Sequence, residues 1–428
     1  MNEIKSNNVA SFLRYSADYI KSFKEQTFIM CVKNSLLDNN SVSNVASDIN
    51  LLSSLGISII VIIDFSDEFS CLSYKRTNIS NFDIENITNA NAKYLLDAVK
   101  KLSTGSIINS ENKIFPLVSF SNLIISKPKG IENGSFQDHQ GEIRSIDTKT
   151  ISDRLDNGEI VLISPLTFSS TNEALYLDID SIVSTISKKI FIDKLIFLNH
   201  TLDNIFTNDN ELTYKELKAL KKRTKNKNTL NTINKILEFC VLEIPKIHIV
   251  PCDTDGAILI ELFTKKGIGC IITNNPLSNI RAADLKDVNS IIKIIEPHEK
   301  SGALVKRSRE LIEIEINKFF VYTYDNFIIG TGFLNIFSEK SIIYAEIGCI
   351  AVHSEHQKNN IGKQLINHLE KIASKKKVKS IFLLTTKSKS WFLNLGYKIS
   401  NIANLPNTKI KLYNKKRNSI VLLKKLQK

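Results

Sequence analysis

The clearest pattern of apolar and polar positions along the chain lies between Ser341 and Ile372. An apolar run from 342 to 352 is long enough for one buried strand, and a polar stretch from 353 to 360 follows it. Apolar side chains then recur at helical spacing, at Ile361, Leu365, Ile366, Leu369 and Ile372. The pattern predicts a buried strand, a polar turn and an amphipathic helix.

Two features make this unit a candidate binding site. Gly348 lies inside the predicted strand, where glycine indicates a bulge or a ligand that approaches the backbone. The turn QKNNIG places unpaired backbone N–H groups at the start of a helix, and such groups bind anions.

The first half of the chain alternates strands and helices with short links, which predicts a parallel sheet. Gly56 ends the first clear helix between two buried strands, and Gly158 marks a later turn. The predicted segments are a helix at 11–26, a strand at 27–37, a helix at 44–56, strands at 57–64 and 113–130, a helix end and strand at 153–166, a helix and strand at 178–200, a loop and surface helix at 202–230, a helix at 231–243, a strand at 246–250 and an apolar helix within 253–272.

The stretch TNNPLSN (273–279) has the turn residues of a domain boundary. We therefore expect domains at 1–274 and 280–428, joined by a linker at 275–279. The second domain is predicted to contain a strand and helix at 280–297, a helix and a hairpin turning at Asp325–Asn326 within 301–337, a strand and short helix within 379–400, and a closing hairpin at 409–426.

Composition indicates a globular protein without membrane segments. The chain has 428 residues, of which 43% are hydrophobic and 24% charged. It has no apolar run of transmembrane length and no secretory signal at its start. Six cysteines are scattered without a CxxC pair, which favours reduced thiols in a cytoplasm and argues against a zinc site or a disulfide framework. We expect a cytoplasmic protein with no metal.

The formal net charge of +13 comes largely from lysine runs such as 221–223, 375–377 and 415–417. These runs flank helix ends and lack the interleaved aromatic residues of a nucleic-acid surface. The pattern favours solvated surface and no nucleic-acid partner.

The turn from Gln357 to Gly362 resembles the acyl-CoA-binding motif of the GCN5-related N-acetyltransferases (GNAT), Gln/Arg-x-x-Gly-x-Gly/Ala. Asn360 replaces the first glycine of that motif, and asparagine tolerates a positive φ better than most residues. The order of elements in the first half resembles the amino-acid kinase fold. The turns at 33–36 and 64–68 lack the glycines with which active kinases of that fold hold phosphates, and the second carries three carboxylates. We therefore predict a kinase-like domain without phosphoryl transfer.

The segment DTDGAILIELFTKKGIGCII (253–272) is similar to the arginine pocket of arginine-regulated members of the kinase branch. That similarity implies an allosteric arginine site at Tyr19, Glu261, Gly267 and Gly269, in which the carboxylate pairs with arginine. By residue type alone, a helix cap and a turn explain the same segment.

Taken together, the motifs resemble the bacterial N-acetylglutamate synthases, a family of amino-acid N-acetyltransferases. The motifs are SLGI (54–57), ELFTKKGIG (261–269), LVKRSRE (304–310), AEIGCIAVH (345–353), LLTTKSKSWFLNLGY (383–397) and LYNKKRNS (412–419). The resemblance implies an α/β protein: an amino-acid kinase-like three-layer sandwich with a mainly parallel sheet, followed by a GNAT domain. It also implies acetyl-CoA as co-substrate, L-glutamate as substrate, feedback inhibition by L-arginine and a homo-oligomer, often a hexamer.

The resemblance assigns the reaction to the second domain. Glu346 matches the general base, acting through water, and N–H groups freed by a bulge at Cys349 and Ile350 would bind the thioester oxygen. Ile350 and Val352 would line the pantetheine arm. The turn would hold the pyrophosphate through Gln357, Lys358, Asn359, Asn360, Ile361, Gly362 and Lys363.

Glutamate carries two carboxylates, which guanidinium groups bind in bidentate geometry. Arg307 and Arg417 match the substrate-binding arginines of the family, and Cys349 and Thr385 match positions that contact the amino acid. Direct transfer needs no thiol nucleophile, so we expect Cys349 to be inert. Trp391 and Tyr397 are predicted core residues of the last helix. Two alternatives stay open: an acetyltransferase for another amine, and a non-catalytic arginine sensor.

Overall fold

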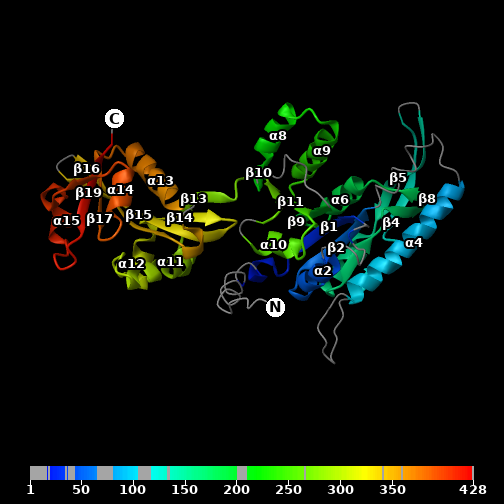
Figure 1. The fold of residues 1–428 in the computed structure, drawn as a ribbon, viewed down its shortest axis with the longest axis horizontal. Coiled ribbons are helices and arrows are strands. Elements are labelled where there is room, and N and C mark those ends of the chain that lie inside the picture. Colours follow the sequence, from blue (N-terminus) through cyan, green and yellow to red (C-terminus); the bar gives the residue numbers. More distant parts are fainter. Residues whose placement is uncertain are drawn as a thin grey trace, which may run out of the picture. The chain divides into compact units, whose positions relative to one another are not determined.

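The structure is a computed structural model that describes residues 17, 20–33, 36, 44–64, 81–104, 117–132, 135–199, 210–264, 267–339, 342–357 and 360–426. The chain forms two compact units, Met1–Asn275 and Pro276–Lys428, and each is described by itself (Figure 1). The predicted turns at 34–35 and 65–68, Tyr19, Lys358 and Asn359 lie outside the described residues.

The first unit is built on an eight-stranded sheet in which every neighbouring pair is parallel except β11 with β12. In spatial order the strands are β10 (Glu211–Thr213), β12 (Cys270–Thr273), β11 (Lys246–Pro251), β9 (Lys194–Asn199), β1 (Thr27–Lys33), β2 (Ser58–Asp64), β6 (Ile160–Ile163) and β3 (Val118–Phe120). The predicted mainly parallel sheet is confirmed. Its central strands β1 and β2 are buried along their middles, as continuous apolar runs require.

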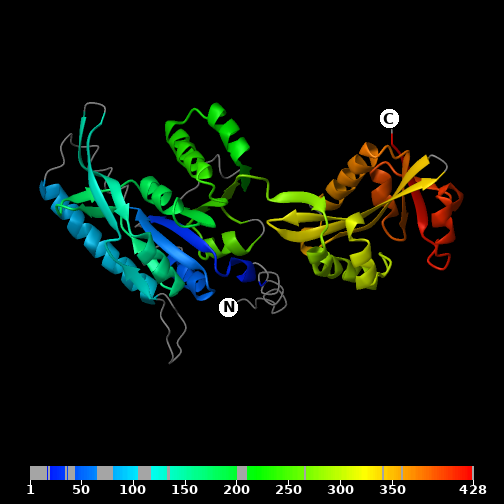
Figure 2. The same cartoon turned by 180° about the vertical axis from the view of Figure 1, so that it is seen from behind.

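Helices cover both faces of this sheet, which gives the three-layer sandwich. One face packs on α5 (Thr148–Asp156), α6 (Ile179–Ser187), α8 (Tyr214–Arg223) and α9 (Lys227–Val241). The other side carries α2 (Val45–Ser54), α10 (Ala257–Phe263) and the long α4 (Asn81–Thr104), drawn in cyan in Figure 2. A second, small sheet closes on itself and contains β4 (Ile124–Glu132), β5 (Ser135–Ile146), β8 (Ala174–Tyr176) and β7 (Leu166–Ser169).

The second unit is built on a seven-stranded mixed sheet. In spatial order its strands are β13 (Ser278–Ala282), β14 (Phe319–Tyr324), β15 (Phe327–Glu339), β16 (Ile342–Val352), β17 (Ser380–Thr385), β19 (Ile420–Lys425) and β18 (Lys398–Ser400). One face packs on α13 (Ile361–Lys375) and α14 (Lys389–Asn394). The other face packs on α11 (Val288–Lys300), α12 (Arg309–Ile314) and α15 (Asn407–Lys411). The predicted turn between β14 and β15 is confirmed, with φ of 48° at Asp325 and 68° at Asn326.

The predicted closing hairpin at 409–426 is wrong, because helix α15 ends at Lys411, turns follow it, and only the last part, β19, is a strand. The carboxylate of Glu339 accepts hydrogen bonds from the backbone N–H groups of Asn407 and Thr408, at 2.9 and 3.0 Å. Satisfying two N–H groups at a helix start favours a helical turn there. The Glu339 side chain comes from a strand far away in sequence, so the local pattern at 409–413 carries no sign of it.

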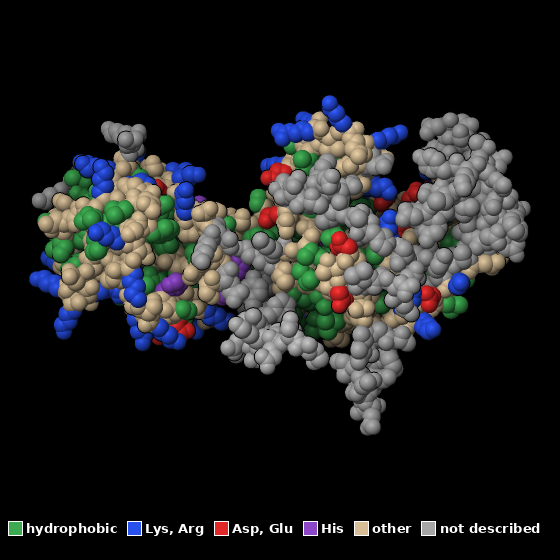
Figure 3. Space-filling model, viewed as in Figure 1, with side chains coloured by type: hydrophobic (Ala, Val, Ile, Leu, Met, Phe, Trp, Pro, Cys, Tyr) green, Lys and Arg blue, Asp and Glu red, His purple; other side chains and the backbone are tan. Residues whose placement is uncertain are grey.

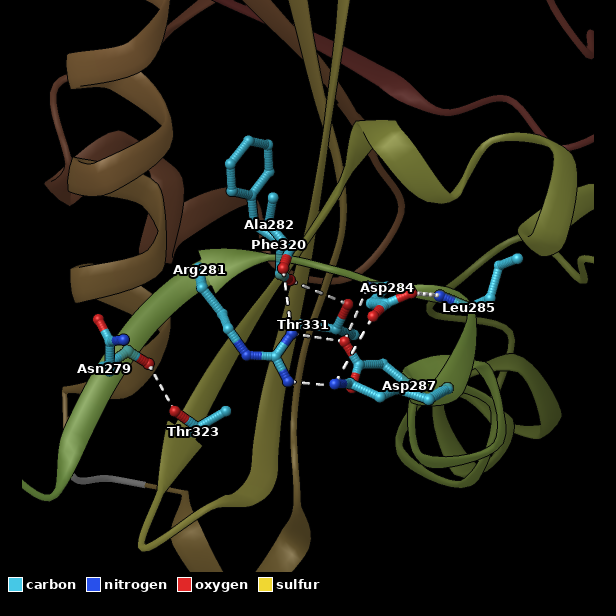
Figure 4. Close-up of polar contacts among 10 residues, drawn as sticks. Asn279, Arg281, Ala282, Asp284, Leu285, Asp287, Phe320, Thr323 and Thr331 are labelled. Carbon is cyan, nitrogen blue, oxygen red and sulfur yellow. Dashed lines mark hydrogen bonds and ion pairs between the residues drawn. The ribbon is translucent and has the colours of Figure 1, made fainter.

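Figure 4 shows how β13 is joined to the helix that follows it. The guanidinium of Arg281 donates two hydrogen bonds to Asp287, at 2.6 and 3.0 Å, and this pairing holds the pKa of Asp287 below its usual value. Asp284 caps the 3-10 turn η2 (Leu285–Asp287) that precedes α11. Strand β13 begins at Ser278, inside the predicted linker, because it pairs with β14.

Many of the basic side chains lie at the surface. In Figure 3 Lys and Arg side chains gather over α8 and α9, and Lys221, Lys222 and Arg223 are exposed at the end of α8. Within the part of the chain that the structure describes, every helix is too short or too polar to span a membrane.

Candidate functional site

A cleft opens in the second unit where two parallel strands separate. Strands β16 and β17 pair only as far as Glu346, which lies opposite Phe382, although β16 continues to Val352 and β17 to Thr385. Beyond this fork the two strand ends line a cleft of about 430 Å³. The fork therefore exposes strand backbone that an extended ligand can approach.

A bulge lies on the β16 side of the cleft. Thr331 pairs with Ala351 and Phe333 pairs with Gly348, so two residues of β16, Cys349 and Ile350, stand against one residue of β15. Cys349 has a φ of 49°. The bulge predicted near Gly348 is confirmed, and a bulge leaves ladder groups unpaired.

The polar turn forms one end of the cleft. Asn360 has the left-handed conformation, with φ of 58° and ψ of 8°, and α13 begins at the next residue. Asparagine thus provides the backbone conformation for which the family motif uses glycine. The described members of the predicted cofactor set all line the cleft: Ile350, Val352, Gln357, Asn360, Ile361, Gly362 and Lys363.

Trp391 was expected in the core, and this is wrong. Its side chain is 38% exposed, it lines the cleft, and its ring lies against Gly362, where an added Cβ would stand 3.2 Å from the ring. Tyr397 is 1% exposed, as expected of a core residue. His298 and His356 also line the cleft and were not predicted.

Glu346 lies at the fork with its side chain on the α15 face of the sheet. Its neighbour Tyr344 on the same face packs with α15, whereas Ala345 and Ile347 pack with α13. The residue as a whole is 9% exposed, and Oε1 of its carboxylate is 2.6 Å from Nζ of Lys409.

Arg307 lies on the same face of the sheet, close to the bulge. Its guanidinium stacks over Phe333, 4.4 Å from the ring centroid, and Nη1 donates to Glu315 at 3.0 Å. The thiol of Cys349 is buried, and burial raises its pKa to about 11 although the charge of Arg307 opposes this. Cys349 is therefore a neutral thiol near neutral pH, as an inert packing residue would be.

Arg417 holds one edge of the cleft. Its guanidinium donates to the carbonyl oxygens of Gly302, Ala303 and Leu304, at 2.9 to 3.1 Å. This places Arg417 against the loop that leads into Arg307. Thr386 and Lys387 hold the same loop from the end of β17, and the neighbouring Thr385 lines the cleft. Of the four predicted substrate contacts, Cys349 and Thr385 line the cleft, whereas Arg307 and Arg417 are not among its lining residues.

The described residues that were predicted to bind arginine form a cluster in the first unit. Glu261 is buried, its Oε1 lies 2.8 Å from Nδ1 of His248, and its Oε2 accepts from the N–H groups of Ile268 and Gly269. Burial raises the pKa of Glu261, but these donors outweigh it and the net direction is downward. Gly267 has a φ of 56°, and an added Cβ would collide with the Glu261 carboxylate. His248 was missed by the sequence analysis.

The cleft in the second unit has groups of the kinds that acyl transfer requires. A carboxylate stands at the fork, a bulged strand runs along one wall, and the start of a helix closes the end. Among the described residues, no group of three or more His, Cys, Asp or Glu side chains could hold a metal ion.

Comparison with known families agrees with these two units. Residues 34–250 match the Amino acid kinase family, and residues 288–397 match the Acetyltransferase (GNAT) family. The chain is 30% identical to an amino-acid acetyltransferase of Yersinia pseudotuberculosis (serotype O:1b), covering 98% of this chain and 99% of the relative. It is 28% identical to an amino-acid acetyltransferase of Pasteurella multocida, covering 99% of both.

Solved structures share the fold over almost the whole chain. N-acetylglutamate synthase from Neisseria gonorrhoeae complexed with coenzyme A and L-arginine has a TM-score of 0.85 at 24% identity, covering 98% of this chain and 99% of that one. The same enzyme complexed with coenzyme A and N-acetyl-glutamate has a TM-score of 0.58 at 26% identity, with the same coverage. The chain therefore belongs to the amino-acid acetyltransferases, in which a kinase-like unit precedes a GNAT unit, and it is an N-acetyltransferase.

Proposed function

We propose that the chain transfers the acetyl group of acetyl-CoA to the amine of L-glutamate, giving N-acetyl-L-glutamate and CoA in the first step of arginine biosynthesis. The observation that carries this proposal is the fork between β16 and β17, with Glu346 at its base, Arg307 near the β16 bulge and Arg417 bound to the loop at the cleft edge. The Neisseria enzyme bound to coenzyme A and N-acetyl-glutamate supports the choice of ligands.

In this proposal acetyl-CoA lies along the end of β16. The pantetheine arm runs beside Ile350 and Val352, and the pyrophosphate meets the helix start at residues 357–363, including Lys358 and Asn359. A helix start favours anions because its N–H groups are unpaired and its dipole is positive there. N–H groups of the bulge polarise the thioester carbonyl.

Glu346 takes a proton from the glutamate ammonium through water. The freed amine attacks the thioester carbon, the C–S bond breaks, and the leaving CoA sulfur takes up the proton that the attacking nitrogen loses as the amide forms. Cys349 and Thr385 shape the space in which the amino acid lies.

Arg307 and Arg417 bind the two carboxylates of glutamate. A guanidinium has five N–H donors, and Arg307 uses one of them on Glu315. The side-chain bonds of Arg417 go to three carbonyl oxygens of the cleft edge. Arg417 binds the carbonyl oxygen of Leu304, three residues before Arg307, so both arginines belong to or contact the same loop.

Residues 1–274 are proposed to be a regulatory domain that has lost phosphoryl transfer, and residues 280–428 the catalytic domain. L-Arginine would inhibit by binding near Glu261, Gly267, Gly269 and Tyr19, with His248 added to this set because it contacts Glu261. The Neisseria enzyme complexed with L-arginine supports the choice of arginine as the ligand.

The substrate is tested by steady-state release of CoA in Arg307→Ala and Arg417→Ala. We expect the KM for glutamate to rise at least about tenfold in each, because a lost charge-assisted bond costs about 1.5–3 kcal/mol, while the KM for acetyl-CoA changes little. Thr386→Val is the control, since it removes another bond to the same loop without removing a guanidinium.

If Thr386→Val reproduces the effect of Arg417→Ala, Arg417 acts on the loop and not on the substrate. Turnover of glutamate that is indifferent to both arginine variants would favour an acetyltransferase for another amine. The non-catalytic sensor receives no support, because the chain belongs to a family of acetyltransferases.

A further inference from the structure

The ion pair between Lys409 and Glu346 is the one polar contact of the candidate base. Nζ of Lys409 lies 2.6 Å from Oε1 of Glu346, and the two side chains are 20% and 12% exposed. Among the described residues, Glu346 makes no other side-chain hydrogen bond or ion pair. Its Oε2 is therefore the oxygen left for a water molecule or a proton.

Lys409 is held in place by its helix. Glu339 on β15 binds the first two N–H groups of α15 and the hydroxyl of Thr408. On the same helix, Ile410 packs into a cluster around Phe382, the residue that pairs with Glu346. The ammonium group is thus presented to the fork by an element that is fixed at its start and along its side.

Few other charged groups face Glu346 from the surrounding elements. Its partners in the sheet, Asn335 and Phe382, are uncharged. The remaining titratable or charged side chains on the elements packed around it are Tyr344 and Cys349 on β16, the exposed Lys411 on α15, Tyr413 after α15, Glu339 on β15, Lys425 and the Glu370-paired Lys424 on β19, and Arg307 near the bulge. Lys409 is the cation in direct contact.

We infer that Lys409 is a positioning residue that keeps the Glu346 carboxylate ionised and turns its free oxygen toward the cleft. This inference rests on the proposed role of Glu346 as the general base. Burial disfavours an ionised carboxylate, and an opposite charge within a few ångströms favours it. Lys409 contacts neither substrate in this scheme and acts only through Glu346.

The contact with Lys409 also offsets the negative charge that Glu346 brings to the site. Glutamate brings two negative carboxylates and one ammonium into the cleft, and an unpaired Glu346 would repel those carboxylates. Pairing with Lys409 neutralises that repulsion and leaves Arg307 and Arg417 to meet the substrate.

The test is the pH dependence of kcat/KM for glutamate in Lys409→Met, which removes the charge and keeps the length. We expect the fall in rate at low pH to move upward by about one pH unit or more. Activity relative to the parent should therefore fall by up to about tenfold on the acidic side of the profile and approach that of the parent at high pH. Lys409→Arg should restore the parent profile in part.

Lys411→Met is the matched control, because Lys411 lies on the same helix and is exposed. It should leave the profile unchanged. The ionisation of the substrate amine is common to all variants, so a difference between them belongs to the protein.

Two further variants separate this inference from the proposal on which it rests. If Glu346→Gln keeps both the rate and the profile, Glu346 is not the base and both ideas are wrong. If Glu346→Gln loses activity but Lys409→Met lowers the rate equally at every pH, only the role of Lys409 is overturned. Thermal unfolding gives a reading without activity: Lys409→Met should lower the Tm in the parent but not in the Glu346→Gln background.

Discussion

Asp48 is a carboxyl group buried under the sheet of the first unit. It is 5% exposed, and its Oδ2 has no hydrogen-bond partner among the described residues. Burial and the nearby charge of Asp255 raise its pKa from 3.8 to about 7, against the opposing bond from the N–H of Ile258. Between about pH 4 and pH 7 the Asp48 carboxyl is therefore protonated in the folded chain and ionised in the unfolded chain.

This predicts a stability that falls as the pH rises. Since the folded pKa is above the unfolded one, the contribution of Asp48 is complete below about pH 4 and is lost by about pH 7. Asp48→Asn, which stays neutral, should raise the free energy of unfolding near pH 8 by at most about 4 kcal/mol, and the Tm with it. Near pH 4 it should change the Tm little. The exposed Asp153→Asn is the control. Equal Tm differences at both pH values would contradict the prediction.

Single residues were predictable where the backbone dictates the side chain. The αL position of Asn360 and the bulge at Cys349 follow from turn and strand chemistry that is local in sequence. The position of Trp391 at the cleft was not predictable, because an aromatic residue at helical spacing gives the same pattern whether it faces a core or a cleft. The space beside it depends on Gly362 from another element.

At the level of elements, α15 depends on one side chain outside it. We predict that Glu339→Ala frees the start of α15, because two N–H groups and the Thr408 hydroxyl lose their acceptor. Losing such a cap costs about 1 kcal/mol, so Lys409 should leave Glu346 part of the time. We expect kcat/KM at low pH to fall by about threefold to tenfold, in the same direction as Lys409→Met.

The control for that experiment is Glu313→Ala, which breaks an exposed pair with Arg309 on α12 and should change the rate little. If Glu339→Ala lowers stability but leaves the pH profile as it is in the parent, the cap does not act through Lys409.

The strongly apolar elements were the easiest to predict. Strands β1, β2, β6 and β16 and helix α13 were found with small errors at their ends. The long helix α4 and the pair β4 and β5 were missed or shortened, since all three carry many polar residues. Their stability comes from tertiary packing, which a local pattern does not show.

At the scale of the molecule, each unit has its own apolar core. One cluster joins strands and helices between Ile29 and Ile272, and others join residues between Val288 and Leu422. The boundary between the domains was predicted at 275–279 from turn residues, and the two compact units of the structure divide between Asn275 and Pro276. The number of copies in an assembly stays a prediction, which a solution mass would test.

Two independent cores predict two separable unfolding transitions in calorimetry of the full chain. A ligand that binds only the folded form stabilises its unit by about 2.7 kcal/mol at one hundred times its Kd, which corresponds to roughly 5–10 °C for units of this size. Coenzyme A should raise only the transition of the unit from Pro276 to Lys428, and arginine only that of the unit from Met1 to Asn275. Asp48→Asn assigns the transitions, because near pH 8 it should move only the one of the first unit. If either ligand moves both transitions equally, the two units are coupled in unfolding, and the prediction of independent units is wrong.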